Sequence, residues 1–286
     1  MIYTLKLEGW TLTFVQACAL NLESHEKFSE DLYAALKTVE KSDLGTQGSN
    51  IRVYKRSTEC RGLIKASSEM VVDIMWLFSR HPLLLGVFDD AANLFIYEVT
   101  DNGKDLITQI WLTVRRSTLP VEKHDYYRLM CCPYVSDKGK SNIEEYLSGL
   151  VAVSHGNDVD VIFTHELKRQ FGASVEFSEL NRGCCVIHED SPVTYVTLSP
   201  DSTALAVATE SGEVKFYILE NIQEIVCVQN WTPHEGKFVT CIMFLDAPVD
   251  APPNIQFWKF ALTAGDKNRE LKLWSCETWQ CLGTLR

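Results

Sequence analysis

The side chains of this sequence that could carry acid–base or metal chemistry are carboxylates and histidines in short polar segments. Asp89 and Asp90 are adjacent, and paired carboxylates can act as a general acid and base or hold a cation. His188 and His234 each precede an apolar run, and histidine can transfer protons or bind a metal near neutral pH. Because turns need side chains that hydrogen-bond the backbone, we expect the carboxylates to cap amides and the histidines to hold turns within the fold.

No combination of these residues defines a catalytic centre in the sequence. It contains no serine, histidine and aspartate in a defensible triad order, no glycine-rich phosphate loop after a strand and no His-x-x-x-His pair. The sequence therefore predicts a protein that is not an enzyme and that uses no cofactor and no metal ion.

The overall charge disfavours direct binding to nucleic acid. The chain of 286 residues has a formal net charge of −11 and a pI of about 5.1, so it repels phosphate backbones. The basic residues between Arg52 and Lys65 are expected to line a solvated strand edge, which leaves RNA binding as a minor alternative. The segment Trp10–Leu20 is too polar for a signal peptide, and no run reaches the ~18 apolar residues of a membrane span.

The elements that must position these side chains are strand-like apolar runs that recur in groups. In each group three adjacent runs are followed by an outer one, and short polar turns separate several of them. The groups comprise Val71–Leu77, Leu83–Phe88, Asn93–Val99 and Leu106–Val114; Arg128–Tyr134, Gly149–His155, Asp158–Thr164 and Gly183–His188; Val193–Ser199, Ala204–Thr209, Glu213–Leu219 and Glu224–Trp231; and Phe238–Leu245, Phe257–Ala264, Glu270–Ser275 and Gln280–Arg286. Upstream, Ile51–Lys55 and Gly62–Ala66 have the character of the last strands of a further unit.

This recurrence is typical of WD repeats and predicts an all-β fold, a WD-repeat β-propeller with about four to five blades. Each blade is a twisted four-stranded sheet whose two faces must be covered by its neighbours, which explains runs as apolar as Leu83–Phe88. An aromatic residue near the end of each third strand is expected to fill the space between blades. These aromatic residues are Tyr97, Phe163, Tyr217 and Trp274.

The predicted propeller is incomplete, because about four to five blades fall short of the larger rings common among WD-repeat proteins. We therefore expect the chain to be a fragment, an isoform or the product of an incomplete gene model, with a small closed ring as the alternative. Residues 1–48 form a divergent N-terminal segment, and residues 49–286 form the partial propeller. Helical spacing of apolar residues predicts a short amphipathic helix at about 25–41, which we expect to pack on a rim or face of the propeller.

An ordered set of motifs resembles a known family. The motifs are Leu84–Gly86, Asn93–Phe95, Val114–Arg116, Cys132–Tyr134, Trp231–Lys237, Phe257–Phe260, Gly265–Trp274 and Trp279–Leu282. In this order they resemble the WD-repeat domain of the enhancer of mRNA decapping scaffold family, the large processing-body proteins of animals, over about residues 50–286. Residues 1–48 do not resemble the family's first blade. We expect the chain to lack the family's low-complexity linker and its C-terminal helical region, to which the family's self-association is attributed.

The resemblance implies a non-enzymatic scaffold or adaptor that acts in cytoplasmic mRNA decapping and turnover. Its expected partners are proteins of the mRNA-decapping machinery, and its expected location is the cytoplasm and its processing bodies. Two rival functions stay open at this point. One is a WD-repeat adaptor of another pathway, such as a vesicle coat, and the other is a propeller hydrolase.

The candidate partner-contact residues stand in segments that the strand pattern makes exposed loops. They are Arg115, Arg116, Asn268, Arg269 and Glu270. Arginine is favoured at interfaces because its planar fork pairs with carboxylates through two parallel hydrogen bonds. Internal pairing with the many acidic residues of the chain is the competing interpretation.

Overall fold

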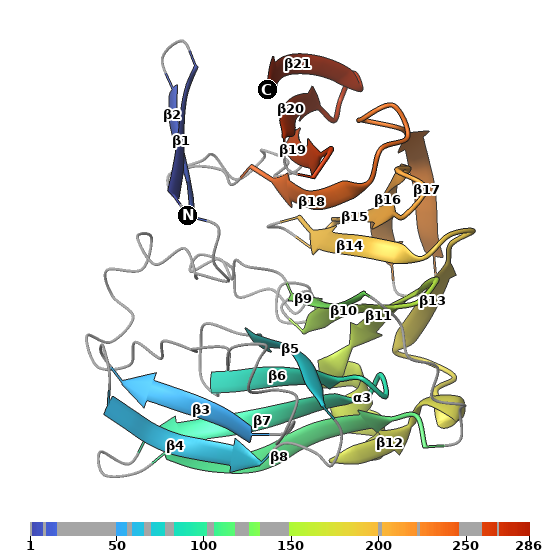
Figure 1. Ribbon diagram of the computed structural model, residues 1–286. Coiled ribbons are helices and arrows are strands. Elements are labelled where there is room, and N and C mark those ends of the chain that lie inside the picture. Colours follow the sequence, from blue (N-terminus) through green and yellow to red (C-terminus); the bar gives the residue numbers. More distant parts are fainter. Residues whose placement is uncertain are drawn as a thin grey trace.

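The structure is a computed structural model whose sheets follow one another along an arc (Figure 1). It describes residues 2–7, 10–15, 50–55, 59–65, 70–77, 83–101, 106–117, 126–131, 149–199, 202–221, 224–245, 259–267 and 269–286. The helix predicted at about 25–41 lies outside these residues.

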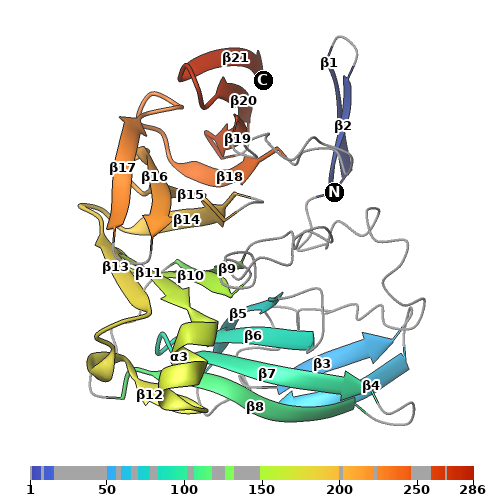
Figure 2. The ribbon, with the colours of Figure 1, turned by 180° about the vertical axis from the view of Figure 1, so that it is seen from behind.

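Four sheets, here called blades 1 to 4, are built from strands that are mostly consecutive in the chain (Figures 1 and 2). Blade 1 contains β5 (Val71–Trp76), β6 (Leu83–Asp89), β7 (Leu94–Asp101) and β8 (Leu106–Arg115), and blade 2 contains β9 (Tyr127–Cys131), β10 (Leu150–His155), β11 (Asp158–Phe163) and β13 (Cys184–His188). Blade 3 contains β14 (Val193–Leu198), β15 (Ala204–Thr209), β16 (Val214–Asn221) and β17 (Glu224–Trp231), and blade 4 contains β18 (Val239–Phe244), β19 (Phe260–Gly265), β20 (Glu270–Ser275) and β21 (Gln280–Leu285). The predicted all-β propeller is confirmed.

Two further antiparallel pairs lie upstream of blade 1. They are β1 (Ile2–Leu7) with β2 (Trp10–Val15) and β3 (Asn50–Lys55) with β4 (Glu59–Lys65). Ile51 of β3 is buried in a cluster with Val87 and Tyr97 of blade 1. The pair β3–β4 therefore covers one face of blade 1, in the position expected for the last strands of a preceding blade.

The alternation of side chains along each strand sends apolar groups to both neighbouring blades. In β10, Val151 and Val153 pack toward blade 1, whereas Leu150 and Ala152 pack toward blade 3. All residues of this strand are buried. Because each fully buried aliphatic side chain contributes about 1.5–3 kcal/mol, the contacts between blades are the main source of stability.

The segment that joins β11 to β13 has secondary structure of its own. It contains α3 (Thr164–Phe171), β12 (Ser174–Glu176) and a short 3-10 turn, η3 (Phe177–Glu179). Leu167 and Phe171 are one helical turn apart and pack into the core between blades 1 and 2. Two apolar residues are too few to reveal such a helix in the sequence.

Strand β12 adds to the outer edge of blade 1 as its fifth strand, and it runs parallel to β8. The Thr113 amide donates a hydrogen bond to the Ala173 carbonyl (2.9 Å), and the Lys168 ammonium donates to the Trp111 carbonyl (2.6 Å). The linker of blade 2 is thus bonded to the backbone of blade 1. Among the described residues, no helix has the length and apolar character needed to span a bilayer.

Replacement of Phe216 by alanine tests whether packing between blades 3 and 4 holds the fold. This ring has no exposed surface and lies edge-on to Phe244 and Trp279, with ring centres 5.6 and 5.0 Å away. We expect Phe216→Ala to lower the free energy of unfolding by about 3–5 kcal/mol, measured by urea denaturation. The control is Phe260→Ala, because Phe260 is 44% exposed. Equal midpoints for the two variants would contradict this account of the core.

Candidate functional site

The polar groups singled out in the sequence gather at one end of the blades, which we call the carboxylate rim. It is defined by four buried carboxylates, Asp89, Asp160, Glu189 and Glu270. Strand register places the turn between the second and third strands of each blade at this end, beside the end of the outer strand. At this rim, exposed turns adjoin internal polar networks.

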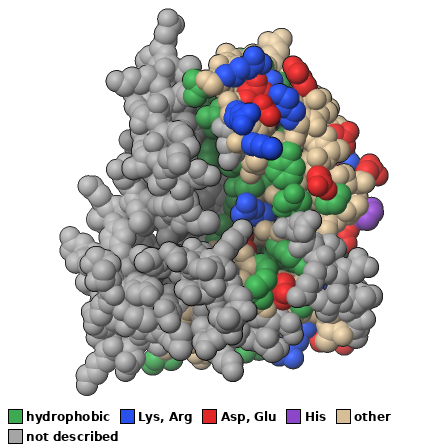
Figure 3. Space-filling view, in the orientation of Figure 1, with side chains coloured by type: hydrophobic (Ala, Val, Ile, Leu, Met, Phe, Trp, Pro, Cys, Tyr) green, Lys and Arg blue, Asp and Glu red, His purple; other side chains and the backbone are tan. Residues whose placement is uncertain are grey.

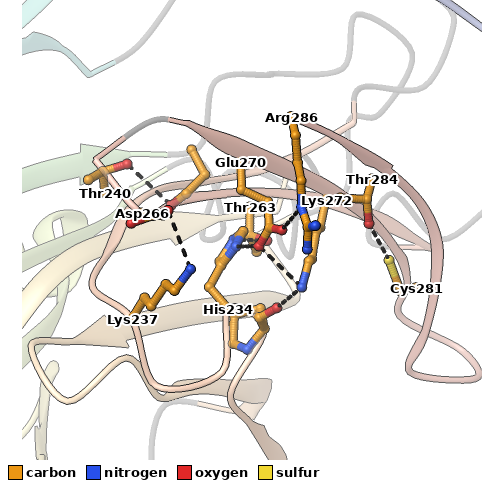
Figure 4. A network of polar contacts seen from close by, with 12 residues as sticks. His234, Lys237, Thr240, Thr263, Asp266, Glu270, Lys272, Cys281, Thr284 and Arg286 are labelled. Carbon is orange, nitrogen blue, oxygen red and sulfur yellow. Dashed lines mark hydrogen bonds and ion pairs between the residues drawn. The ribbon is translucent and has the colours of Figure 1, made fainter.

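The network of blade 4 is built around His234, which is 1% exposed (Figure 4). Its Nδ1 lies 2.8 Å from Glu270 Oε2, and its Nε2 lies 2.9 Å from the Thr263 hydroxyl oxygen. That hydroxyl accepts a hydrogen bond from the Trp274 indole nitrogen at 2.9 Å. The network implies that Thr263 donates to Nε2 and that the proton of a neutral imidazole stays on Nδ1.

Electrostatics keep this network in one protonation state. Burial is the main cause that lowers the pKa of His234, so the imidazole is neutral at physiological pH. Hydrogen bonds from His234, Arg286 and Lys272 lower the pKa of Glu270 to about 2. Gly265 is required beside the imidazole, because a Cβ at that position would lie 2.4 Å from His234. His234 thus joins the loop before blade 4 to β19 and β20 and has no atom left for metal or proton transfer.

Glu270 was predicted to be an exposed partner contact, and the structure corrects this. Its side chain is 9% exposed and pairs with Lys272 (3.2 Å) and Arg286 (2.8 Å) in addition to His234. The Glu270 carboxylate is buried because the His234 imidazole and two cations stabilise its charge there better than solvent would. Asn268 lies outside the described residues, and Arg269 is exposed in the turn between β19 and β20.

Arg116 was also predicted to be an exposed contact, and it is instead 8% exposed. Its guanidinium forms an ion pair with Asp160 of blade 2, and its Cζ lies 3.4 Å from the centre of the Phe177 ring. His155 Nε2 lies 3.1 Å from the same carboxylate oxygen, whereas Asp160 Oδ1 has no hydrogen-bond partner in the described part of the chain. A carboxylate buried in an apolar sheet needs a counter-charge, and this need draws Arg116 inward. Its neighbour Arg115 stays exposed at the end of β8.

The structure places His188 differently from His234. It is the last residue of β13, with its side chain 73% exposed and its Nδ1 2.7 Å from Asp158 Oδ1. The Asp158 carboxylate raises the pKa of His188. The next residue, Glu189, is the buried group between β13 and β14. It accepts a hydrogen bond from the Tyr217 hydroxyl (2.6 Å) and forms an ion pair with Lys215 (2.6 Å).

Sequence reasoning missed Asp160 and Glu189. The signal for Asp160 was a carboxylate in the middle of the otherwise apolar strand Val159–Phe163. The signal for Glu189 was weaker: Lys215 and Tyr217 are two residues apart on β16 and therefore share one face, where they need an acceptor.

Asp89 and Asp90 cap the turn of blade 1. Asp89 accepts hydrogen bonds from the backbone amides of Ala91 (3.1 Å) and Asn93 (2.8 Å), and burial raises its pKa. Asp90 accepts from the Met70 amide at 3.1 Å. These contacts are the amide capping that the sequence predicts. Within the described residues, no group of three or more His, Cys, Asp or Glu is arranged to hold a metal ion.

The aromatic residues of the third strands lie between blades. Tyr97, Phe163 and Tyr217 are buried, and the last two share the cluster between blades 2 and 3. Trp274 is half-buried and lies edge-on to Trp231, with ring centres 6.1 Å apart.

Successive four-stranded antiparallel blades with polar networks at one rim define the class of the chain as a WD-repeat propeller. A family model described as the WD40 region of Ge1, enhancer of mRNA-decapping protein, matches residues 31–286. The chain therefore belongs to the Ge1 WD40 family. The match begins at residue 31, upstream of residue 49, where the sequence pattern places the start of the propeller.

Similar proteins carry the same name. The chain is 31% identical over 244 residues to enhancer of mRNA-decapping protein 4 of Danio rerio, covering 83% of this chain and 17% of that protein. It is 32% identical over 241 residues to the Homo sapiens protein of that name, covering 82% and 17%. The Drosophila melanogaster homolog is 30% identical over 243 residues, covering 82% and 18%. The chain thus spans about a sixth of the length of these curated relatives.

Among solved structures, a chain of the mitotic checkpoint complex matches with a TM-score of 0.54 and 12% identity, over 83% of this chain and 58% of that one. This likeness concerns the fold alone.

Removal of the guanidinium of Arg116 tests the ion pair between blades 1 and 2. We expect Arg116→Ala to lower the free energy of unfolding by about 3–5 kcal/mol, because Asp160 is then buried without its cation. Arg115→Ala is the control, since this exposed neighbour should change stability by less than about 0.5 kcal/mol. Both are measured by urea denaturation, and the account fails when the two variants are equally stable.

Replacement of Glu270 by glutamine tests the charge of the blade 4 network. The folded-state pKa of Glu270 is about 2, below its ordinary value of 4.5, so its stabilising effect is present above pH 4.5 and lost as the pH falls toward 2. We expect Glu270→Gln to be less stable than the parent at pH 7 and to lose less stability between pH 4.5 and 2. The control Asp266→Asn changes a partly exposed carboxylate in the same turn. Parallel pH profiles for Glu270→Gln and the parent would rule out this role.

Proposed function

We propose that the chain is a non-enzymatic WD-repeat scaffold that acts in cytoplasmic mRNA decapping and turnover through protein–protein contacts. The observation that carries this proposal is the family match over residues 31–286, with relatives named for the enhancement of mRNA decapping. The proposed partners are proteins of the decapping machinery, and the proposed location is the cytoplasm and its processing bodies.

The state of the rim supports a binding role over a catalytic one. His234 is neutral and bonded through both ring nitrogens, and Asp89 is occupied by backbone amides. Asp160 and Glu189 are each paired with a cation. These groups are held by the fold, whereas exposed side chains such as Arg115 and Arg269 point to contacts with other molecules.

We also propose that residues 49–286 act as the propeller unit and residues 1–48 as a separate N-terminal segment. Within the unit, Arg115 and Arg269 stand at the rim of blades 1 and 4, and Asn268 precedes Arg269 in the sequence. They are the proposed partner contacts.

Quantitative co-purification from cytosol tests the proposal. We expect the tagged chain to enrich decapping proteins over a tag-only sample, and the variant Arg115→Glu with Arg269→Glu to reduce that enrichment about tenfold, because each reversal replaces attraction by repulsion at a contact. The matched control is Arg169→Glu with Arg182→Glu, two exposed arginines on the linker of blade 2. Enrichment of vesicle-coat subunits in place of decapping proteins would contradict the proposal.

A further inference from the structure

The rim end of blade 4 carries a cluster of cations that we call the basic corner. Its members are Lys237, Lys267, Arg269, Lys272 and Arg286. They come from the loop before β18, the turn between β19 and β20, β20 itself and the residue after β21. The register places them together, because Gly265 pairs with both Val239 and Glu270, and Leu271 pairs with Leu285. In Figure 3, blue side chains surround red ones at the top of the molecule, over blade 4.

The carboxylates of the corner do not neutralise it. Glu270 is shared by Lys272 and Arg286, and Asp266 pairs with Lys237 at 3.3 Å. Lys267 and Arg269 are exposed and have no ion-pair partner in the described part of the chain. With Glu235 as the third acid, the corner holds five cations against three carboxylates, although the chain as a whole has a net charge of −11.

Two of the cations, Lys272 and Arg286, are held in place by a carboxylate of the corner. Glu270 fixes Arg286, whose side chain is 77% exposed, through a 2.8 Å contact at Nε (Figure 4). The turn that carries Lys267 has positive φ at both Asp266 (51°) and Lys267 (58°). This conformation costs a lysine about 1 kcal/mol, and such strain is commonly found where side chains are presented to a ligand.

We infer that the basic corner binds an acidic segment of a protein partner, one with several closely spaced aspartates or glutamates. The corner matches such a segment in sign and in extent, because its cations are confined to the end of one blade. An anionic chain longer than the corner, whether nucleic acid or peptide, would meet exposed acids on the neighbouring rim of blade 3, where Asp190 is 95% exposed and Glu210 is also exposed. The corner therefore fits a short acidic segment. The inference names the kind of segment recognised by the scaffold proposed above and rests on that proposal.

The test is fluorescence anisotropy of a labelled oligoglutamate peptide titrated with the 286-residue chain. We expect binding at low ionic strength that weakens as salt is added, and no binding of an oligoglutamine peptide of equal length. Lys267→Glu with Arg269→Glu should weaken binding about tenfold, since two attractive contacts become repulsive. Both residues are exposed turn residues without ion pairs, so the variant keeps the core and the Glu270 network.

The matched control again reverses Arg169 and Arg182, and we expect it to stay within about twofold of the parent, because these exposed arginines lie on another blade. Three results would each overturn the inference: no peptide binding, equal affinity of the Lys267 and Arg269 variant, or tighter binding of a labelled oligouridine than of the peptide. If decapping proteins still co-purify in any of these cases, only the acidic-segment inference fails and the scaffold function stands.

Discussion

The need to cover both faces of every sheet governs this structure. A single blade is a small sheet with apolar side chains on each face, and it is stable only between neighbours. The strand β10 shows the consequence, since Val151 and Val153 serve one interface and Leu150 and Ala152 the other. The side chains left for contacts with other molecules are therefore the exposed ones at the rims and outer edges.

The same constraint explains why polar chemistry at the rim is directed inward. Asp160, Glu189 and Glu270 are removed from water, and each pairs with a cation from another strand or loop. Arg116 and His234 are the partners that join one blade to the segment before it. Arginine, histidine and carboxylate side chains suggest partner binding or catalysis in the sequence. In several blades they instead stabilise the fold.

Much of the fold could be predicted from the sequence, because the repeated strand pattern follows directly from two-sided burial. The strands of blade 3, for example, fall within a residue or two of the predicted runs Ala204–Thr209 and Glu213–Leu219. The candidate site was less accessible, because exposure depends on long-range pairing. The residues near Arg116 in the chain give no sign of its partner Asp160, which lies 44 residues away. Glu270 and Arg286 are brought together only by the register of β20 and β21. The helix α3 was missed because only Leu167 and Phe171 mark its buried face.

The added strand β12 ties the first two blades together through main-chain hydrogen bonds. Because a stretch of the blade 2 linker is hydrogen-bonded edge to edge with β8, pulling these blades apart requires the rupture of main-chain bonds in addition to the exposure of apolar surface. Blades 3 and 4 meet through ring contacts such as Phe216 on Phe244 and through the Thr194 hydroxyl on the Val239 carbonyl. In blades 1 and 2 the contact therefore includes main-chain hydrogen bonds, whereas blades 3 and 4 are held by ring packing and a side-chain hydrogen bond.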